Sequence, residues 1–285
     1  MIGLLLPDIH NEFYTASAAV LQTVLDDAGF QLLVATTGND PKAEQAALAA
    51  MLDGQVDGIV HVPVDDTAEL PTDVPIVQLN RRSEPTRVPA VVSDDVDGVA
   101  ALTAAIIEAG HTDLAVIVGP PDHSTSRGRL AGYHRAVAEA GIPETDERTD
   151  RGRSRVLVCP FTPDGGAAAL ADVADDLPHA LIALSSRLTL GVLRECGERG
   201  IRIPADLSLA GRGDPEWYAV GQPPLTTYVP PLAEMGRRAA LTLLDLLGER
   251  PITPATPLVV PGRLVVRSSV AGLIAGAQHP TTVRA

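Results

Sequence analysis

The few aromatic residues of this sequence lie where a ligand could use them. Eight aromatic residues occur in 285, and five lie in the segments just beyond runs that are typical of β-strands: Phe13, Tyr14, Phe161, Trp217 and Tyr218. In open α/β sheets, ligands bind at the carboxyl ends of the strands. Flat rings at that edge suit stacking on a sugar or a purine, although rings can also cover hydrophobic core beneath loops. We favour ligand binding for Phe13, Phe161 and Trp217, and weigh the two possibilities equally for the two tyrosines.

Arginines fall in the same zone. Arg81, Arg127 and Arg212 each follow a predicted strand or the loop after it, and Asn80 and Asp214 are nearby in the sequence. A guanidinium group can grip a carboxylate or neighbouring hydroxyls at two points. A single loop arginine is usually a solvated surface charge, but three at strand ends favour a polar ligand site.

Motifs of catalytic and metal sites are missing from the sequence. No G-x-G-x-x-G follows the first predicted strand, and neither G-x-x-x-x-G-K-[ST] nor G-x-S-x-G occurs. The seven histidines are scattered, without H-x-x-x-H or C-x-x-C pairs, which disfavours a metal site. His10 and His61 fall at strand ends, where they could touch a ligand. We therefore predict no cofactor, no metal and no enzymatic activity.

Charge and hydropathy narrow the choice further. The net charge is −14 and the pI is about 4.8, so the acidic surface should keep this segment alone from binding DNA tightly. No apolar run reaches the roughly 18 residues of a membrane span, and the N-terminal MIGLLLPDIH has no basic leader. We predict a cytoplasmic protein. Cys159 and Cys196 are expected to be buried thiols, although a disulfide between them stays open.

Short apolar runs alternate with longer amphipathic segments, which predicts two α/β units in series. Alternation of strand and helix requires a parallel sheet with helices on both faces. The expected strands are 2–6, 31–36, 56–62, 74–80, 114–118, 155–159, 180–184 and 207–211. The expected helices are 15–28, 41–53, 97–109, 127–140, 165–176 and 187–199. A further helix over 231–247 and strands over 256–262 and 263–270 follow, and must pack somewhere after the second unit is complete.

Several motifs occur in a collinear order from residue 2 to residue 269. They include IGLLLPDIHNEFY, VDGIVHVP, NRRS, AGHTDLAVIVGP, RGRLAGYHRAVAEAGI, GIRIPADLSLAGRGD, PPLTTYVPPLAEMGRRAALTLL and RLVVRSS. In these motifs the chain resembles the effector-binding domain of the LacI/GalR family, whose fold is like that of type I periplasmic binding proteins. Each match alone is weak, but their common order is specific.

The resemblance implies a fold class and a domain division. The fold would be α/β, with two doubly wound parallel-sheet lobes of the periplasmic-binding-protein type joined by three crossovers. The N-terminal lobe would comprise residues 1–92 and 227–249, and the C-terminal lobe residues 93–226 and 250–272. Residues 273–285 would form a C-terminal tail.

The resemblance also places a ligand pocket, with some departures from the family pattern. The carried-over positions are Phe13, Tyr14, Asn80, Arg81, Arg127 and Phe161. Ser185, Arg212, Asp214 and Trp217 complete the predicted ligand-binding set. The family usually has Asp at position 80, an Asn-Asp pair at 185 and 186, an aromatic residue at 212 and Asp at 213. The expected effector is a sugar, a sugar acid or a nucleoside-like molecule. Because groups that grip sugar hydroxyls are lost, we expect the pocket to suit a neutral pyranose less well than an anionic or less polar effector.

The implied function is that of a sensor. A small metabolite held in the cleft between the lobes would change the lobe angle, and a homodimer would pass the change to operator DNA. Family members carry a helix-turn-helix and a hinge helix before the first strand, whereas Met1 directly precedes that strand here, so we expect a piece of a longer regulator. Two alternatives stay open, a periplasmic-type receptor for a sugar or related metabolite and an enzyme on the same architecture.

Overall fold

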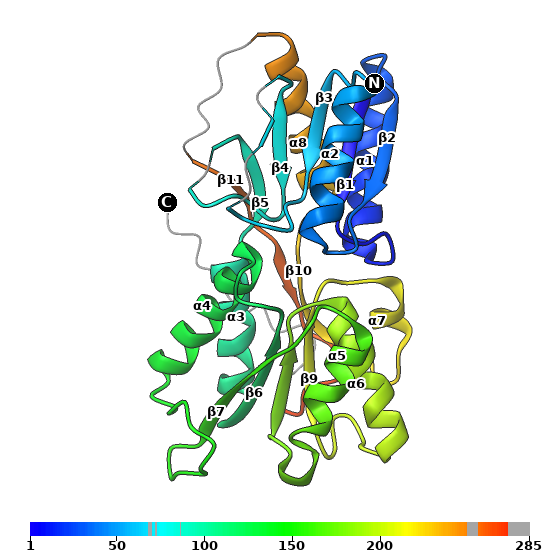
Figure 1. Cartoon of the computed structure of the whole chain (residues 1–285). Helices are drawn as coiled ribbons and strands as arrows, with labels where there is room; N and C mark the ends of the chain where they lie inside the picture. Colours follow the sequence, from blue (N-terminus) through cyan, green and yellow to red (C-terminus); the bar gives the residue numbers. More distant parts are fainter. Residues whose placement is uncertain (68–69, 72, 86, 250–255, 273–285) are drawn as a thin grey trace. The chain divides into compact units, whose positions relative to one another are not determined.

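The computed structural model describes all residues except 68–69, 72, 86, 250–255 and 273–285. The chain forms two compact units (Figure 1). The first unit comprises Met1–Asp94, Asp122–Thr125 and Pro231–Pro261. The second comprises Asp95–Pro121, Ser126–Pro230 and, among the described residues, 262–272.

The first unit is built on a parallel sheet of six strands. Its order is β11-β5-β4-β3-β1-β2, and every pair is parallel. The strands are β1 (Ile2–Leu6), β2 (Leu32–Thr36), β3 (Gly58–His61), β4 (Ile76–Leu79), β5 (Ala90–Ser93) and β11 (Leu258–Val260). Three helices cover it, namely α1 (Glu12–Asp27), α2 (Pro41–Asp53) and α8 (Leu232–Leu247).

Side chains of the first sheet alternate between two cores, because successive residues of a strand point to opposite faces. Leu4 packs with α1 and α8, while Leu5 packs with α2 against a separate cluster. Glycine lets α8 approach α1 closely, since a Cβ at Gly236 would lie 2.7 Å from the backbone oxygen of Ser17. The late helix therefore returns to the first unit and closes its core.

The second unit is also built on a sheet of six strands, one of which is antiparallel. Its sheet has the order β12-β10-β9-β8-β6-β7, and all pairs are parallel except that β12 runs antiparallel to β10. The strands are β6 (Asp113–Val118), β7 (Arg153–Val158), β8 (Ala180–Ala183), β9 (Ser208–Arg212), β10 (Thr226–Val229) and β12 (Arg263–Val265). The helices are α3 (Asp95–Glu108), α4 (Ser124–Glu139), α5 (Pro163–Ala171), α6 (Ser186–Arg199), α7 (Glu216–Val220) and the 3₁₀ turn Ala174–Asp176.

Both faces of the second sheet are covered. Val116 packs with α3 and α4, whereas its neighbour Ile117 packs with α5 and α6. The predicted two-lobed α/β fold is confirmed, with β12 as an antiparallel edge. None of the helices among the described residues is long and apolar enough to cross a membrane.

Local sequence explains where several helices begin and end. Asn11, Asp40, Thr162 and Ser185 each accept a hydrogen bond from a backbone N–H in the first turn of α1, α2, α5 and α6, respectively. Such caps satisfy amide groups that have no partner inside the helix. Gly200 ends α6 at a φ of +70°, a conformation in which glycine has no steric cost.

Some boundaries differ from the sequence expectation. Helix α1 begins at Glu12 rather than residue 15, because Asn11 is its cap, so Phe13 and Tyr14 lie in the first helical turn. The helix expected over 165–176 is α5 followed by a separate 3₁₀ turn. Residues 250–272 were expected in the second lobe, whereas β11 pairs with β5 and the first unit extends to Pro261. Residues 250–255 and the predicted tail 273–285 lie outside the described residues.

Candidate functional site

Asn80 lies at the carboxyl edge of the first sheet with a buried oxygen that has no partner. It directly follows β4 and adopts a φ of +66°, a region that asparagine tolerates better than most side chains. Its Nδ2 donates a long hydrogen bond of 3.4 Å to the Tyr14 hydroxyl. Its Oδ1 is buried and has no hydrogen-bond partner among the described residues. An unpaired buried acceptor costs about 1–3 kcal/mol, so this oxygen is suited to receive a donor from a ligand.

Arg81 lies beside Asn80 and is held by the same unit. Its side chain is buried, and Nη1 donates to the Asn39 Oδ1 at 3.1 Å and to the Pro63 carbonyl oxygen at 3.3 Å. The rings of Phe13 and Tyr14 meet edge to face with centroids 5.2 Å apart. The hydrogen bond from Asn80 to Tyr14 links the end of β4 to the helix that follows β1. The structure thus brings the predicted residues of the first unit to one edge of its sheet.

A buried aspartate at the carboxyl edge of the second sheet holds two arginines. Asp95 at the start of α3 accepts from Arg212 Nε at 2.7 Å and from Arg129 Nε at 3.0 Å. Arg129 also donates to the Leu184 carbonyl oxygen at 3.0 Å, and its guanidinium lies 5.9 Å from the centroid of the Phe161 ring. All three charged side chains are buried. Such a cluster is tolerated only because hydrogen bonds replace the lost water.

Sequence reasoning named Arg127 and missed Arg129. Arg127 is half-buried and donates to the Pro121 carbonyl oxygen. Residues two apart on a helix point in nearly opposite directions, so only one of the two can face the sheet edge. The run RGRLAG contains both arginines. Gly132, three residues after Arg129, could have distinguished the two arginines. A Cβ at Gly132 would lie 2.2 Å from the Val96 backbone oxygen, so this face of α4 packs closely on α3.

The other predicted residues of the second unit have defined local contacts. Phe161 packs on Gly119, where a Cβ would lie 2.1 Å from the ring. Ser185 caps α6 by accepting from the Arg187 N–H at 3.2 Å. Trp217 lies edge to face with Tyr218, with centroids 4.5 Å apart.

Asp214 has a partner that sequence reasoning did not name. Both of its carboxylate oxygens accept from Arg267, at 2.7 and 2.8 Å. Arg267 also donates to the Leu225 carbonyl oxygen at 2.8 Å. A two-point ion pair of this kind fixes the loop after β9 against the C-terminal segment.

The two cysteines of the chain are not paired with each other. Cys159 and Cys196 are both free thiols, and burial raises the pKa of each to about 11. A thiol with a raised pKa stays protonated at neutral pH and is a poor nucleophile. Among the described residues, no group of three or more His, Cys, Asp or Glu side chains could hold a metal ion.

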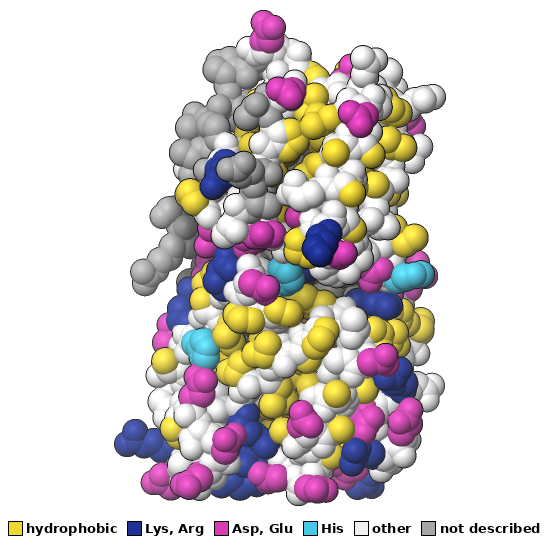
Figure 2. Space-filling model, viewed as in Figure 1, with side chains coloured by type: hydrophobic (Ala, Val, Ile, Leu, Met, Phe, Trp, Pro, Cys, Tyr) yellow, Lys and Arg dark blue, Asp and Glu magenta, His cyan; other side chains and the backbone are white. Residues whose placement is uncertain are grey.

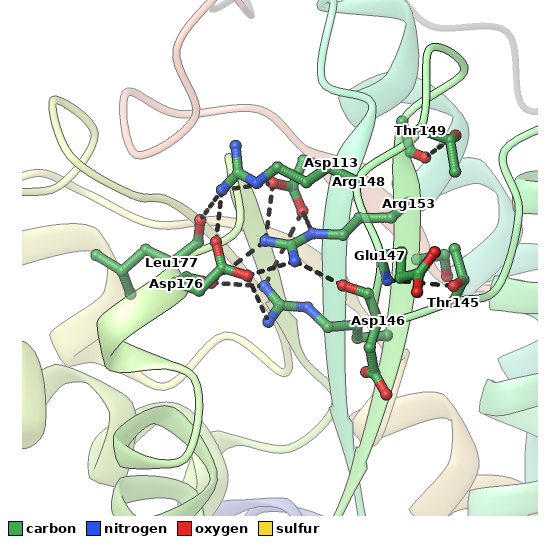
Figure 3. A network of polar contacts seen from close by, with 12 residues as sticks. Asp113, Thr145, Asp146, Glu147, Arg148, Thr149, Arg153, Asp176 and Leu177 are labelled. Atoms are coloured by element: carbon green, nitrogen blue, oxygen red, sulfur yellow. Dashed lines mark hydrogen bonds and ion pairs between the residues drawn. The ribbon is translucent and has the colours of Figure 1, made fainter.

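A third cluster lies at the amino edge of the second sheet (Figure 3). Asp113 and Arg153 are the first residues of β6 and β7, and Arg153 Nε donates to Asp113 Oδ1 at 2.7 Å. Arg153 also contacts Asp176, and Arg148 Nη2 bridges Asp176 Oδ1 at 2.9 Å and Asp113 Oδ2 at 3.0 Å. We do not assign Arg153 to a ligand site, because its guanidinium group also donates to backbone oxygens such as that of Asp146. The hydrogen bond from Arg153 holds the pKa of the Asp176 carboxyl well below its usual range.

Comparison with known proteins supplies the family. Residues 103–270 match the family model of a periplasmic binding protein-like domain. The HTH-type transcriptional regulator DegA of Bacillus subtilis is 30% identical over 283 residues, which cover 96% of this chain and 81% of the relative. The chain belongs to the LacI family of transcription regulators.

Solved structures of LacI-family regulators agree with that assignment. A LacI family transcriptional regulator from Mycobacterium smegmatis has a TM-score of 0.83 at 28% identity, covering 95% of this chain and 99% of that one. The transcriptional regulator CelR, solved as a complex with cellobiose, has a TM-score of 0.79 at 28% identity, covering 94% and 84%. The chain is therefore the effector-binding core of a LacI-type regulator. These relatives are transcription regulators and not enzymes. They support the prediction of a regulator over the alternative of a periplasmic-type receptor.

Proposed function

We propose that the carboxyl edges of the two sheets supply the effector-binding residues of this LacI-family core. The observation that carries the proposal is the buried Oδ1 of Asn80, which has no hydrogen-bond partner among the described residues. A buried acceptor of this kind lowers the stability of the folded state unless a ligand or a water molecule supplies a donor. The proposed set keeps nine of the ten predicted residues and has Arg129 in place of Arg127: Phe13, Tyr14, Asn80, Arg81, Arg129, Phe161, Ser185, Arg212, Asp214 and Trp217.

The proposed effector is a sugar acid or a nucleoside-like metabolite. Guanidinium groups of Arg81, Arg129 and Arg212 lie at the two edges, and guanidinium recognises carboxylate and phosphate groups well. The carboxylate of Asp214 is engaged by Arg267, and position 185 carries a serine whose hydroxyl caps α6, so neither position offers a free carboxylate to sugar hydroxyls. A neutral sugar is the second candidate, because the similar CelR structure holds cellobiose and Phe161 offers a ring for stacking.

The proposed working form is a homodimer whose DNA-binding heads precede this core. Large hydrophobic side chains are exposed on each unit, including Leu33 and Val34 of β2 and Val158, Leu190 and Val220 of the second unit. Figure 2 shows hydrophobic side chains gathered on the visible face of the second unit. Exposed apolar side chains that gather in patches mark protein–protein contacts. The proposal includes no catalytic step, cofactor or metal, and places the regulator in the cytoplasm.

Calorimetry and thermal shift with four probes test the effector class. The probes are D-gluconate, adenosine, D-ribose and D-glucose, each titrated against the protein. A ligand at a hundredfold its dissociation constant stabilises the folded state by about 2.7 kcal/mol. We expect a shift with D-gluconate or adenosine, and expect its loss in Asn80→Ala, which removes the buried amide. Tight binding of D-glucose with no binding of D-gluconate or adenosine would contradict the proposed class.

Paired variants on one helix test which arginine binds. Arg129→Lys should weaken binding at least tenfold, because lysine cannot reproduce the fork of guanidinium donors. Arg127→Ala is the matched comparison, and the same loss there with none in Arg129→Lys would replace Arg129 by Arg127 in the site.

A further inference from the structure

A buried glutamate of α2 reaches the loop that follows β3. Glu44 has no exposed surface. Its Oε1 accepts from the Val64 backbone N–H at 2.7 Å and from His61 Nε2 at 2.8 Å. Its Oε2 accepts a longer hydrogen bond of 3.4 Å from the Asp65 backbone N–H. A buried carboxylate is unfavourable unless donors replace its water, and these three groups are its replacement.

The histidine of this pair has a defined hydrogen position. His61 is the last residue of β3, and its side chain is fully buried. A carboxylate only accepts hydrogen bonds, so Nε2 carries the hydrogen that points at Glu44. His61 Nδ1 is buried and has no partner in the described part of the chain. A neutral ring leaves only a lone pair unmet, whereas an imidazolium would bury a second N–H without an acceptor, so the neutral Nε2–H form is assigned.

The loop held by Glu44 carries a contact to a proposed effector-binding residue. Pro63 lies between His61 and Val64, the two residues that Glu44 binds most closely. The Pro63 carbonyl oxygen accepts from Arg81 Nη1 at 3.3 Å. The Pro63 carbonyl and the Val64 N–H belong to one planar peptide group, so the carboxylate that holds the Val64 N–H also fixes the direction of this carbonyl.

We propose that Glu44 and His61 form a positioning pair that orients Arg81 for the effector. Neither residue is assigned a contact with the effector itself. The inference rests on the proposed function, since it takes Arg81 to be part of the effector site. The competing explanation is that the pair only stabilises the packing of α2 on β3.

Three variants separate positioning from packing. Glu44→Ala removes the acceptor, and Glu44→Gln keeps a carbonyl oxygen that can still accept from Val64 and His61. Asp53→Ala removes an exposed carboxylate at the end of the same helix and is the matched control. The first readout is NMR of the Arg81 guanidinium, with its signals assigned by Arg81→Lys. The second is amide hydrogen exchange at Val64, and the third is calorimetry with D-gluconate and adenosine.

Positioning predicts a specific pattern of changes. In Glu44→Ala, exchange at the Val64 amide should accelerate about tenfold relative to Asp53→Ala, as expected for one lost hydrogen bond to a charged group. The Arg81 Nη signals should average by faster rotation, and the dissociation constant of the probe that binds should rise about tenfold. Glu44→Gln should restore the Arg81 signals and most of the affinity, which a loss of packing alone would not do.

Several outcomes would overturn the inference. A folded Glu44→Ala protein with unchanged Arg81 signals and unchanged affinity would reduce the pair to a packing role. If that variant does not fold, the unmodified protein still decides, because a Val64 amide that exchanges as fast as an exposed loop, or a His61 ring with its hydrogen on Nδ1, contradicts the assigned geometry. If neither probe binds, the proposed effector class fails, while the Arg81 signals still test the positioning pair.

Discussion

Two clusters of arginine and aspartate lie at opposite edges of the second sheet, and they differ in what they hold. At the amino edge, Arg153 joins Asp113 to Asp176 and to the backbone of the loop before β7 (Figure 3). At the carboxyl edge, Arg129 and Arg212 converge on the side chain of Asp95, where β8 and β9 end. The same residue types thus serve a structural joint at one edge and a proposed binding surface at the other.

The difference follows from the geometry of a parallel sheet. Strands of such a sheet present their carboxyl ends together, where loops are free to vary and ligands bind. At the amino ends, the chain returns from the helices to the strands. The charged side chains of the cluster there, such as Arg153, hold the connecting loops in place. A buried cluster of charged side chains therefore indicates a ligand site only when it lies at the carboxyl edge of the sheet. Variants at the amino edge should mainly reduce stability, whereas variants at the carboxyl edge should mainly reduce effector binding.

The largest effect is expected at the amino edge. Arg153→Ala would leave Asp113 buried beside fewer cations, and removal of one partner from a buried pair costs about 3–5 kcal/mol. Urea denaturation measures this loss. The probe that binds the unmodified protein should bind the remaining folded variant with an unchanged dissociation constant, and weaker binding would break the division between the edges.

A smaller loss of stability and a larger loss of binding are expected for Arg212→Leu. Asp95 keeps Arg129 in this variant, so the cost should be about 1.5–3 kcal/mol, the range for one hydrogen bond to a charged group. Calorimetry with D-gluconate should show binding weakened at least tenfold relative to Arg153→Ala. Equal affinity in the two variants would remove Arg212 from the proposed site.

Gly119→Ala tests the ring at the carboxyl edge without changing a charge. The new Cβ would lie 2.1 Å from the Phe161 ring, so the ring has to move. Overpacking of this kind costs about 1–3 kcal/mol. We expect adenosine, which would stack on the ring, to lose more affinity than D-gluconate. Gly197→Ala, where a Cβ meets nothing within 4 Å, is the matched control.

The smallest effect is expected for Asp176→Asn, and it is measured in the pH dependence of stability below about pH 5. Arg153 lowers the pKa of Asp176 from an ordinary value of 3.8, so the unfolded state takes up a proton more readily than the folded state. The stability from this contact is complete above pH 3.8 and is lost as the pH falls towards the lower folded pKa. Urea midpoints between about pH 2 and pH 5 should therefore fall less steeply in Asp176→Asn than in Asp53→Asn. Equal slopes would contradict an ionised Asp176 bound by Arg153.

Local sequence was enough to predict the architecture but not the pairing of its charged side chains. Most strands and helices, and their order, followed from apolar runs and helix stop signals, whereas β5, β10 and α7 were not predicted. The site was predicted less completely, as Arg127 and Arg129 show. Both lie in one motif, and only the packing of α4 places Arg129 against Asp95. Asp214 was predicted as a ligand contact without any view of Arg267, which is 53 residues away along the chain.

The sequence by itself determined that this protein has two α/β units and belongs among regulators of one family, because periodicity, caps and motif order are local and cumulative. Only the tertiary structure decided that β11 joins the first sheet, that Asp95 gathers two arginines, and that Glu44 meets His61. These contacts join residues from 17 to 167 positions apart, as Glu44 with His61 and Val91 with Leu258 show. A buried charge has many partners of suitable type in the sequence, and only the packed chain selects which one replaces its water.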